Sequence, residues 1–266
     1  MLRLRAADGG ARMSLRRVVP FGLVAVLIPP LACSAQSHSP FAAAPSNSSS
    51  AVTSVHELQI PEKARKACGE GTKRFAAKDA AGSVVEFQKA IKAFPGYYEA
   101  YAKMGAAELE LEQWGAAESA FRKSMELSHG RYAPANFGLG LILATVTKKF
   151  DEAEAVLRSG LATAPADVSG HFVLAWVLYS TARLKEAEEN AREAIVFDPR
   201  AAGAHLLLAQ IHLQENKMSD VVADLDTYLG LGLASPLDDN VRRIRAQALS
   251  ALAAPKAGAE IADASR

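Results

Sequence analysis

Three histidines are the residues best suited to metal chemistry in this 266-residue chain. His171 and His205 occupy equivalent places in two successive segments of the chain, and His212 follows His205 by seven residues, two turns of a helix. A zinc site needs several His, Cys or carboxylate ligands at short, set spacings. No Cys joins these histidines, and we find no His-x-x-x-His pair and no carboxylate at ligand spacing. We therefore expect partly buried structural histidines, with no metal site and no cofactor.

The acidic residues show no pairing typical of general acid–base catalysis. Glu108, Glu110 and Glu112 alternate along one predicted helix, so they point in three directions and not at one another. A second acidic segment has the pattern of a solvated helix face with local ion pairs; it contains Glu186, Glu188, Glu189, Arg192 and Glu193. Neither group predicts a catalytic site.

Other catalytic motifs are missing from the sequence. It contains no glycine-rich phosphate loop, no nucleophile elbow and no Cys–His pairing. The serines of residues 46–50 lie in a polar linker that could not hold a nucleophile in place. We expect no enzymatic activity and no catalytic residue.

The distribution of charge argues against nucleic-acid binding. The formal net charge is +1, but residues 1–35 hold five arginines against one aspartate. The rest of the chain has 25 basic and 28 acidic residues. A body this close to neutral lacks the positive surface that phosphate binding requires.

Residues 1–35 have the order of a secretory signal peptide: a basic region ending in Arg16-Arg17, then an apolar run, then small residues. The apolar run has about 15 residues and contains three prolines, whereas a membrane span needs about 20. Translation could start at Met1 or Met13. We expect an exported protein, either periplasmic or attached to the envelope as a lipoprotein.

Two modes of cleavage remain open at the end of this segment. Ordinary cleavage would release a chain beginning near Gln36. The local Pro30-Leu31-Ala32-Cys33 resembles a bacterial lipoprotein box at Ala32 and Cys33 only, and lipidation of Cys33 would attach the protein to a membrane. A flexible Ser/Ala/Pro linker follows over residues 36–57.

A period of about 34 residues dominates the chain after this linker. It separates Gly71 from Gly105, and it also separates Phe87 from Phe121, Pro165 from Pro199 and Ala153 from Ala187. Repetition at this length predicts stacked copies of one supersecondary unit. The apolar spacing within each unit is helical, so each unit is expected to be a pair of helices.

These positions resemble the tetratricopeptide repeat, in which small residues, aromatics, alanines and a proline recur at set offsets. The matches in successive units include Gly71, Phe87, Ala90 and Pro95; Tyr101, Gly105, Ala117 and Phe121; Gly140, Ala153 and Pro165; Ala175, Ala187, Ala194 and Pro199; Ala209, Met218 and Val221. The resemblance implies an all-α right-handed superhelix of five helix pairs over residues 58–254.

The array is expected to have two loop insertions and a cap. One extra residue falls in the 128–133 loop and another in the 145–149 turn, because the spacing lengthens there. A last helix follows Pro236, with an apolar face of Val241, Ile244, Ala248 and Leu252 that would cap the open end. Residues 255–266 are expected to be a disordered tail.

Proteins of this family bind partners chiefly on the concave surface lined by the first helix of each unit. The family's clamp of Lys, Arg and Asn for a C-terminal carboxylate is absent, because this surface holds mainly Ala, Phe, Leu and Trp. The resemblance places an apolar groove in units three to five, with the candidate partner-binding residues Phe137, Leu141, Phe172, Trp176, Tyr179, Leu206, Gln210 and Leu213. The groove is either open to a partner or filled by the protein itself.

The function expected from these observations is a non-catalytic scaffold. It would bind a protein or peptide segment in the apolar concave groove and serve bacterial envelope assembly or secretion. The alternatives are a small-molecule or metal carrier, or a regulatory subunit of an envelope enzyme complex. The sequence does not identify the partner or the oligomeric state.

Overall fold

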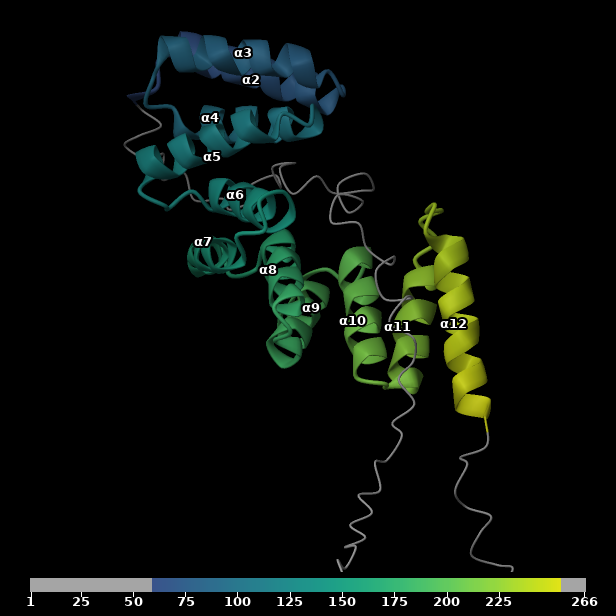
Figure 1. Ribbon diagram of the computed structural model, residues 1–266. Helices are drawn as coiled ribbons and strands as arrows, with labels where there is room; N and C mark the ends of the chain where they lie inside the picture. The colour runs from purple at the N-terminus through teal and green to yellow at the C-terminus, as the bar shows by residue number, and fades with distance from the viewer. Residues whose placement is uncertain (1–58, 255–266) are drawn as a thin grey trace, which may run out of the picture.

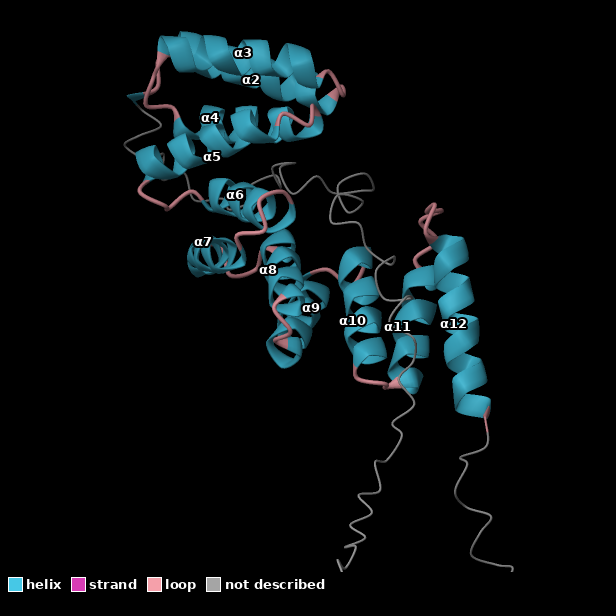
Figure 2. Cartoon of the chain, viewed as in Figure 1, coloured by secondary structure: helices cyan, strands magenta, loops and turns pink. Residues whose placement is uncertain are grey.

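The computed structural model describes residues 59–254, and this part of the chain contains helices and no strands (Figures 1 and 2). Its eleven helices are α2 (Glu62–Ala76), α3 (Ala80–Ala93), α4 (Tyr98–Glu110), α5 (Trp114–Ser128), α6 (Ala133–Thr145), α7 (Phe150–Thr163), α8 (Val168–Ser180), α9 (Leu184–Phe197), α10 (Ala202–Gln214), α11 (Met218–Gly230) and α12 (Asp238–Ala253). The predicted signal peptide, Cys33, most of the linker and the tail lie outside the described residues. Within residues 59–254, no helix is both long enough and apolar enough to cross a bilayer.

The helices form five sequential pairs followed by one cap. Contacts are most extensive within the pairs α2–α3, α4–α5, α6–α7, α8–α9 and α10–α11. Each second helix then contacts the first helix of the next pair, and α12 packs on α11. The predicted all-α array of five helix-turn-helix units with a capping helix is confirmed.

The first helices of the units lie on the inner side of the array. Along the chain α2 contacts α4, α4 contacts α6, α6 contacts α8, and α8 contacts α10. No comparably extensive contact joins successive second helices within the described range. Elements on the inside of a curved stack lie closer together than those outside, so the first helices line the concave surface.

A residue in the left-handed backbone region closes the turn within every pair. These five residues have φ between 56° and 64° and are Lys78, Glu112, Lys148, Ala182 and Asn216. The next amide reaches back to a carbonyl near the helix end, as in Arg183 N–H to Leu178 C=O at 2.9 Å. In unit three the equivalent bond runs from Lys149 to Leu143, one residue further back, which confirms the insertion predicted in this turn.

Small residues bring the two helices of a pair into close contact, as the repeat pattern predicts. A Cβ atom added to Gly71 would lie 2.7 Å from the ring of Phe87, inside van der Waals contact. Ala153 and Ala187, at the equivalent place in the second helices of units three and four, are completely buried. A larger side chain at any of these positions would push the helices apart.

The capping helix α12 buries most, but not all, of its predicted apolar face. Val241, Ile244 and Ala248 are buried against α11. Leu252 is 52% exposed, so its assignment to the buried face is wrong. Helix α12 has 16 residues and α11 has 13, so the last turn of α12 has less helix to cover.

Candidate binding surface

The eight residues predicted to line the groove divide into two groups. Phe137, Leu206 and Gln210 are buried, which means that the protein's own helices cover them. The other five keep part of their surface and pack with their remaining atoms against the core; they are Leu141, Phe172, Trp176, Tyr179 and Leu213. The structure therefore places all eight on first helices but leaves only the second group available to a partner.

Three of these partly exposed residues form a stripe along α8. Phe172, Trp176 and Tyr179 are four and three residues apart, so they project from the same side of the helix. Trp176 contacts Phe150, with ring centroids 6.2 Å apart, and Lys148 Nζ lies 5.3 Å from the centre of the indole ring. Both contacts come from the preceding unit.

The next unit supports the other end of this stripe. The Tyr179 hydroxyl and the Gln210 side chain form a hydrogen bond, and burial raises the pKa of Tyr179. The α8 stripe is thus fixed by unit three on one side and unit five on the other. A partner would meet aromatic side chains whose conformations are already set, which reduces the entropy lost on binding.

A polar contact joins the first helices of the two N-terminal units. Lys103 Nζ lies 3.4 Å from Thr72 Oγ1 and 4.0 Å from the buried Cys68 Sγ. These residues connect α2 with α4.

Among residues 59–254, the most exposed large apolar side chain lies elsewhere and was not predicted from the sequence. Val196, at the C-terminal end of α9, is 71% exposed, and its neighbour Phe197 is also exposed. Phe197 stacks on His171, with ring centroids 5.6 Å apart. The signal in the sequence is the run Ile195-Val196-Phe197, which is too long for the one apolar face of an amphipathic helix.

Two of the histidines have the structural role predicted for them. His171 Nε2 lies 2.9 Å from the carbonyl oxygen of Pro165, and His205 Nε2 lies 3.0 Å from that of Pro199. In each case the ring donates to a carbonyl six residues earlier, in the turn between units. The two histidines occupy equivalent positions of the repeat, so the same bond recurs in consecutive units.

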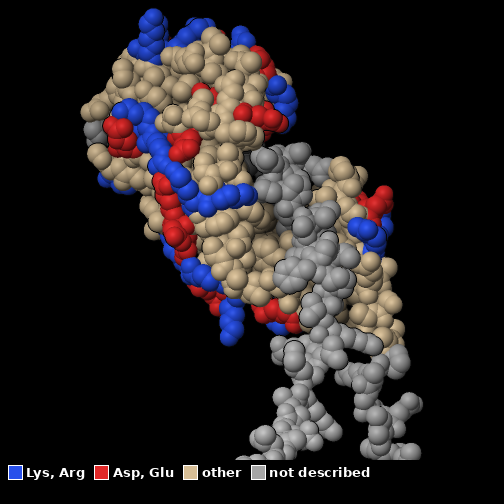
Figure 3. All heavy atoms as spheres, viewed as in Figure 1, with Lys and Arg blue, Asp and Glu red and all other residues tan. Residues whose placement is uncertain are grey.

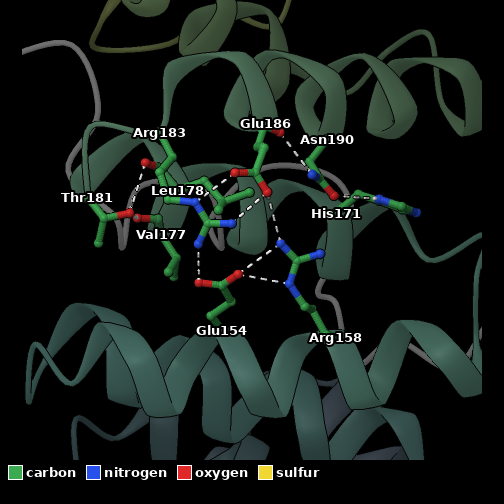
Figure 4. Close-up of polar contacts among 9 residues, drawn as sticks. All are labelled: Glu154, Arg158, His171, Val177, Leu178, Thr181, Arg183, Glu186 and Asn190. Carbon is green, nitrogen blue, oxygen red and sulfur yellow. Dashed lines mark hydrogen bonds and ion pairs between the residues drawn. The ribbon is translucent and has the colours of Figure 1, made fainter.

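Ion pairs connect neighbouring second helices. Arg158 on α7 lies 2.8 Å from Glu154 and 3.2 Å from Glu186 on α9, while Arg183 lies 2.6 Å from both carboxylates (Figure 4). The hydrogen bond from Arg183 lowers the pKa of Glu186. In unit two, Arg122 joins Glu118 to Glu152 in the same way. One face of the molecule shows a band of alternating positive and negative side chains (Figure 3).

His212 has surroundings unlike those of the other two histidines. Its Nδ1 lies 2.7 Å from Asp224 Oδ2, and its Nε2 lies 3.5 Å from Glu188 Oε1. Glu215, three residues after His212, completes a group whose ligand atoms all lie within 4.8 Å of one another. The expectation that no carboxylate stands at ligand spacing from a histidine is wrong here, because His212-x-x-Glu215 is such a spacing.

The same geometry corrects the outward orientation predicted for the acidic face of α9. Glu188 has the predicted local ion pair, with Arg192 at 2.6 Å. However, it also faces the buried His212 of the next unit. Glu188 therefore belongs to the junction between units four and five and not to a freely solvated surface.

Comparisons with known proteins identify the fold. No protein-family model and no curated protein matches the sequence. Among solved structures, PilW, described as a widely conserved type IV pilus biogenesis factor, is 16% identical with a TM-score of 0.65, over 71% of this chain and 87% of PilW. MamA from Desulfovibrio magneticus RS-1, residues 41 to the end, is 18% identical with a TM-score of 0.56, over 66% of this chain and 99% of that one.

A third similar structure is YrrB, described as a tetratricopeptide-repeat protein with an unusual peptide-binding site. It is 16% identical with a TM-score of 0.53, over 68% of this chain and 92% of YrrB. At these identities the similarity establishes a common fold. The chain has the tetratricopeptide-repeat fold that its repeated residues predict.

Proposed function

We propose that this protein is a non-catalytic scaffold that holds an amphipathic or extended segment of a partner protein against the inner surface of α8. The observation that carries the proposal is the stripe of Phe172, Trp176 and Tyr179. These large side chains are partly exposed on the concave side although the array has ample core positions. Aromatic residues fixed in place and partly desolvated are typical anchors of binding surfaces.

The structural neighbours support this class of function. YrrB is described as having a peptide-binding site, and PilW as a pilus biogenesis factor. An envelope role for this chain, in assembly or secretion, rests on the signal-like order of residues 1–35. Export to the periplasm, with or without lipidation of Cys33, belongs to the same proposal. The mass of the mature chain isolated from its source tests it: a product that retains Arg16 and Arg17 would contradict export.

Trp176→Ala is the direct test of the binding surface. If the α8 stripe holds a partner, the substitution should weaken partner capture at least tenfold, since a central aromatic anchor contributes about 2 kcal/mol or more. Capture is measured by pull-down from an envelope extract, quantified by mass spectrometry and normalised to folded protein. Circular dichroism should show unchanged helical content.

Val196→Ser is the matched control, because it removes an exposed apolar side chain away from the stripe. It should leave capture unchanged. If Trp176→Ala lowers the melting temperature and leaves capture intact, the stripe serves folding only. If Val196→Ser is the variant that loses the partner, the binding site lies at the end of α9 instead.

A further inference from the structure

We propose that Glu188, His212 and Glu215 form a binding site for one divalent transition-metal ion, best matched by Zn²⁺, at the junction of units four and five. Glu188 is on α9, His212 is on α10, and Glu215 directly follows the last residue of α10. One imidazole nitrogen with two carboxylate oxygens is a donor set that suits zinc. The site lies apart from the α8 stripe and does not depend on the proposed partner.

The orientation of His212 prepares its ring for a metal. Asp224 Oδ2 lies 2.7 Å from Nδ1 and accepts its proton in a hydrogen bond. In the neutral ring the lone pair is then on Nε2, and this nitrogen faces Glu188 Oε1 at 3.5 Å. In this tautomer both atoms are acceptors, so a metal ion between them would bind to both. At present Arg192 donates a hydrogen bond to the same Glu188 oxygen. Histidine ligands in metal sites commonly have a carboxylate such as Asp224 on the other nitrogen.

The distances are close to those of a tetrahedral site. With zinc bonds of about 2.0–2.1 Å, two ligand atoms at the corners of a tetrahedron lie about 3.3 Å apart. The separation of 3.5 Å between His212 Nε2 and Glu188 Oε1 is near that value. All three donor atoms lie within 4.8 Å of one another. A change of rotamer in the flexible Glu215 side chain would therefore bring its carboxylate to the distance of a metal ligand. Water would fill the fourth position.

The donors differ in burial in a way that allows entry. The His212 side chain is only 4% exposed. Glu188 and Glu215 line an open cleft of about 340 Å³ together with Lys185, Glu189, Arg192 and Lys217. An ion can therefore approach from the side of the two carboxylates while the imidazole remains shielded.

Two cations compete for the carboxylates. Arg192 lies 2.6 Å from Glu188, and Lys217 lies 2.8 Å from Glu215. Ion pairs with exposed partners are weak, contributing about 0–1 kcal/mol each. Arg192 and Lys217 can swing into solvent when a metal ion binds.

The test is zinc binding by the full chain after treatment with EDTA and dialysis into metal-free buffer. Titration with ZnCl₂, followed by calorimetry and by measuring retained metal, should show one site that is lost or weakened at least tenfold in Glu215→Gln and in Glu188→Gln. Asp224→Asn, which removes only the carboxylate behind the ring, should weaken affinity about 10- to 100-fold. Co²⁺ should give the visible spectrum of a tetrahedral complex.

Glu189→Gln is the matched control, because Glu189 lines the same cleft but is not one of the three donors. It should bind zinc as the parent chain does, and melting curves should show that each variant is folded. Zinc should also raise the melting temperature of the parent chain, since the site joins two units. Equal zinc binding by the parent, Glu188→Gln and Glu215→Gln would overturn the proposal. So would a parent chain that retains no zinc, which would mean that a proton alone occupies the gap at His212.

Discussion

In each unit, the backbone carbonyl of one residue near the end of the first helix accepts the hydrogen bond that closes the turn. The side chain at this position differs strongly from unit to unit. In units three and four it is Leu143 or Leu178, both fully buried. In unit two the same place holds Glu108, which is 6% exposed and whose Oε2 has no hydrogen-bond partner among the described residues. Burial raises the pKa of Glu108 to about 7. The chain thus has a buried ionisable group where units three and four have a leucine.

Glu108 should make stability depend on pH. Its pKa is about 7 in the fold and about 4.5 when unfolded, so the folded state binds more protons between these values. Stability should therefore decrease as the pH rises from about 4.5 to 7, by at most about 3 kcal/mol. Glu108→Gln should remove this dependence and stabilise the protein at pH 8 by about 1–3 kcal/mol, as measured by urea unfolding at pH 5 and pH 8.

Glu110→Gln is the control for this measurement, because Glu110 lies two residues away on the same helix and is exposed. It should leave the difference between pH 5 and pH 8 unchanged. If the free energy of unfolding has the same pH dependence in the parent chain and in Glu108→Gln, ionisation of the Glu108 carboxylate does not destabilise the fold.

At the scale of the helix, small residues set how closely each pair packs. Ala187, in the second helix of unit four, is completely buried at the crossing with α8. The same place holds Ala153 in unit three and Val221 in unit five, both fully buried. The spacing of these residues in the sequence therefore predicts where the two helices of each pair are in contact.

Replacing Ala187 by Leu should overpack this crossing and destabilise the protein by about 1–3 kcal/mol. The neighbouring Glu188 cannot serve as an outer-face control, because it contacts Arg192 and faces His212. Glu189 is exposed, and Glu189→Leu should change stability by less than about 0.5 kcal/mol. Thermal melts of the two variants compare them, and equal shifts would mean that the crossing lies at another residue.

The whole molecule is a stack in which each unit depends on its neighbours. Buried residues form a central cluster that runs from α4 to α10, with smaller clusters at the N-terminal end and between α10, α11 and α12. In such an array, stability is close to a sum of terms within units and between adjacent units. A destabilising substitution in a terminal unit should therefore unfold that end of the array before the rest.

Ile244→Asp tests this property at the cap. The charge would lie in the buried cluster that α12 forms with α11, which includes Val221, Leu225 and Tyr228. It should reduce local stability by about 2–4 kcal/mol. Hydrogen exchange should accelerate in α10, α11 and α12 and remain unchanged in α2 to α5. Gln247→Asp, at an exposed position of the same helix, should have no such effect. Uniform acceleration along the whole chain would indicate a single cooperative core.

The sequence by itself determined the helix pairs, their order, the insertion in the 145–149 turn and the cap. This was possible because a repeat depends on local periodicity and on residues such as Gly71 and Ala187, whose small size is needed at every crossing. The other extra residue lies in α5, which has 15 residues, and not in the 128–133 loop where it was predicted. The sequence also indicated that His171 and His205 are structural residues. The structure adds their partners, which are carbonyl groups only six residues away in the same turn. The α8 stripe followed from helical spacing together with the resemblance to the repeat family.

Only the tertiary structure decided which side chains meet between units. Glu188 and His212 lie on different helices of successive units, and their approach depends on how unit five is rotated on unit four. The burial of Glu108, and of Phe137, Leu206 and Gln210 in the predicted groove, depends on the same packing. The repeat period fixes which positions are equivalent, but the contacts of each position depend on the side chains of the neighbouring unit, which the repeat pattern leaves free to vary.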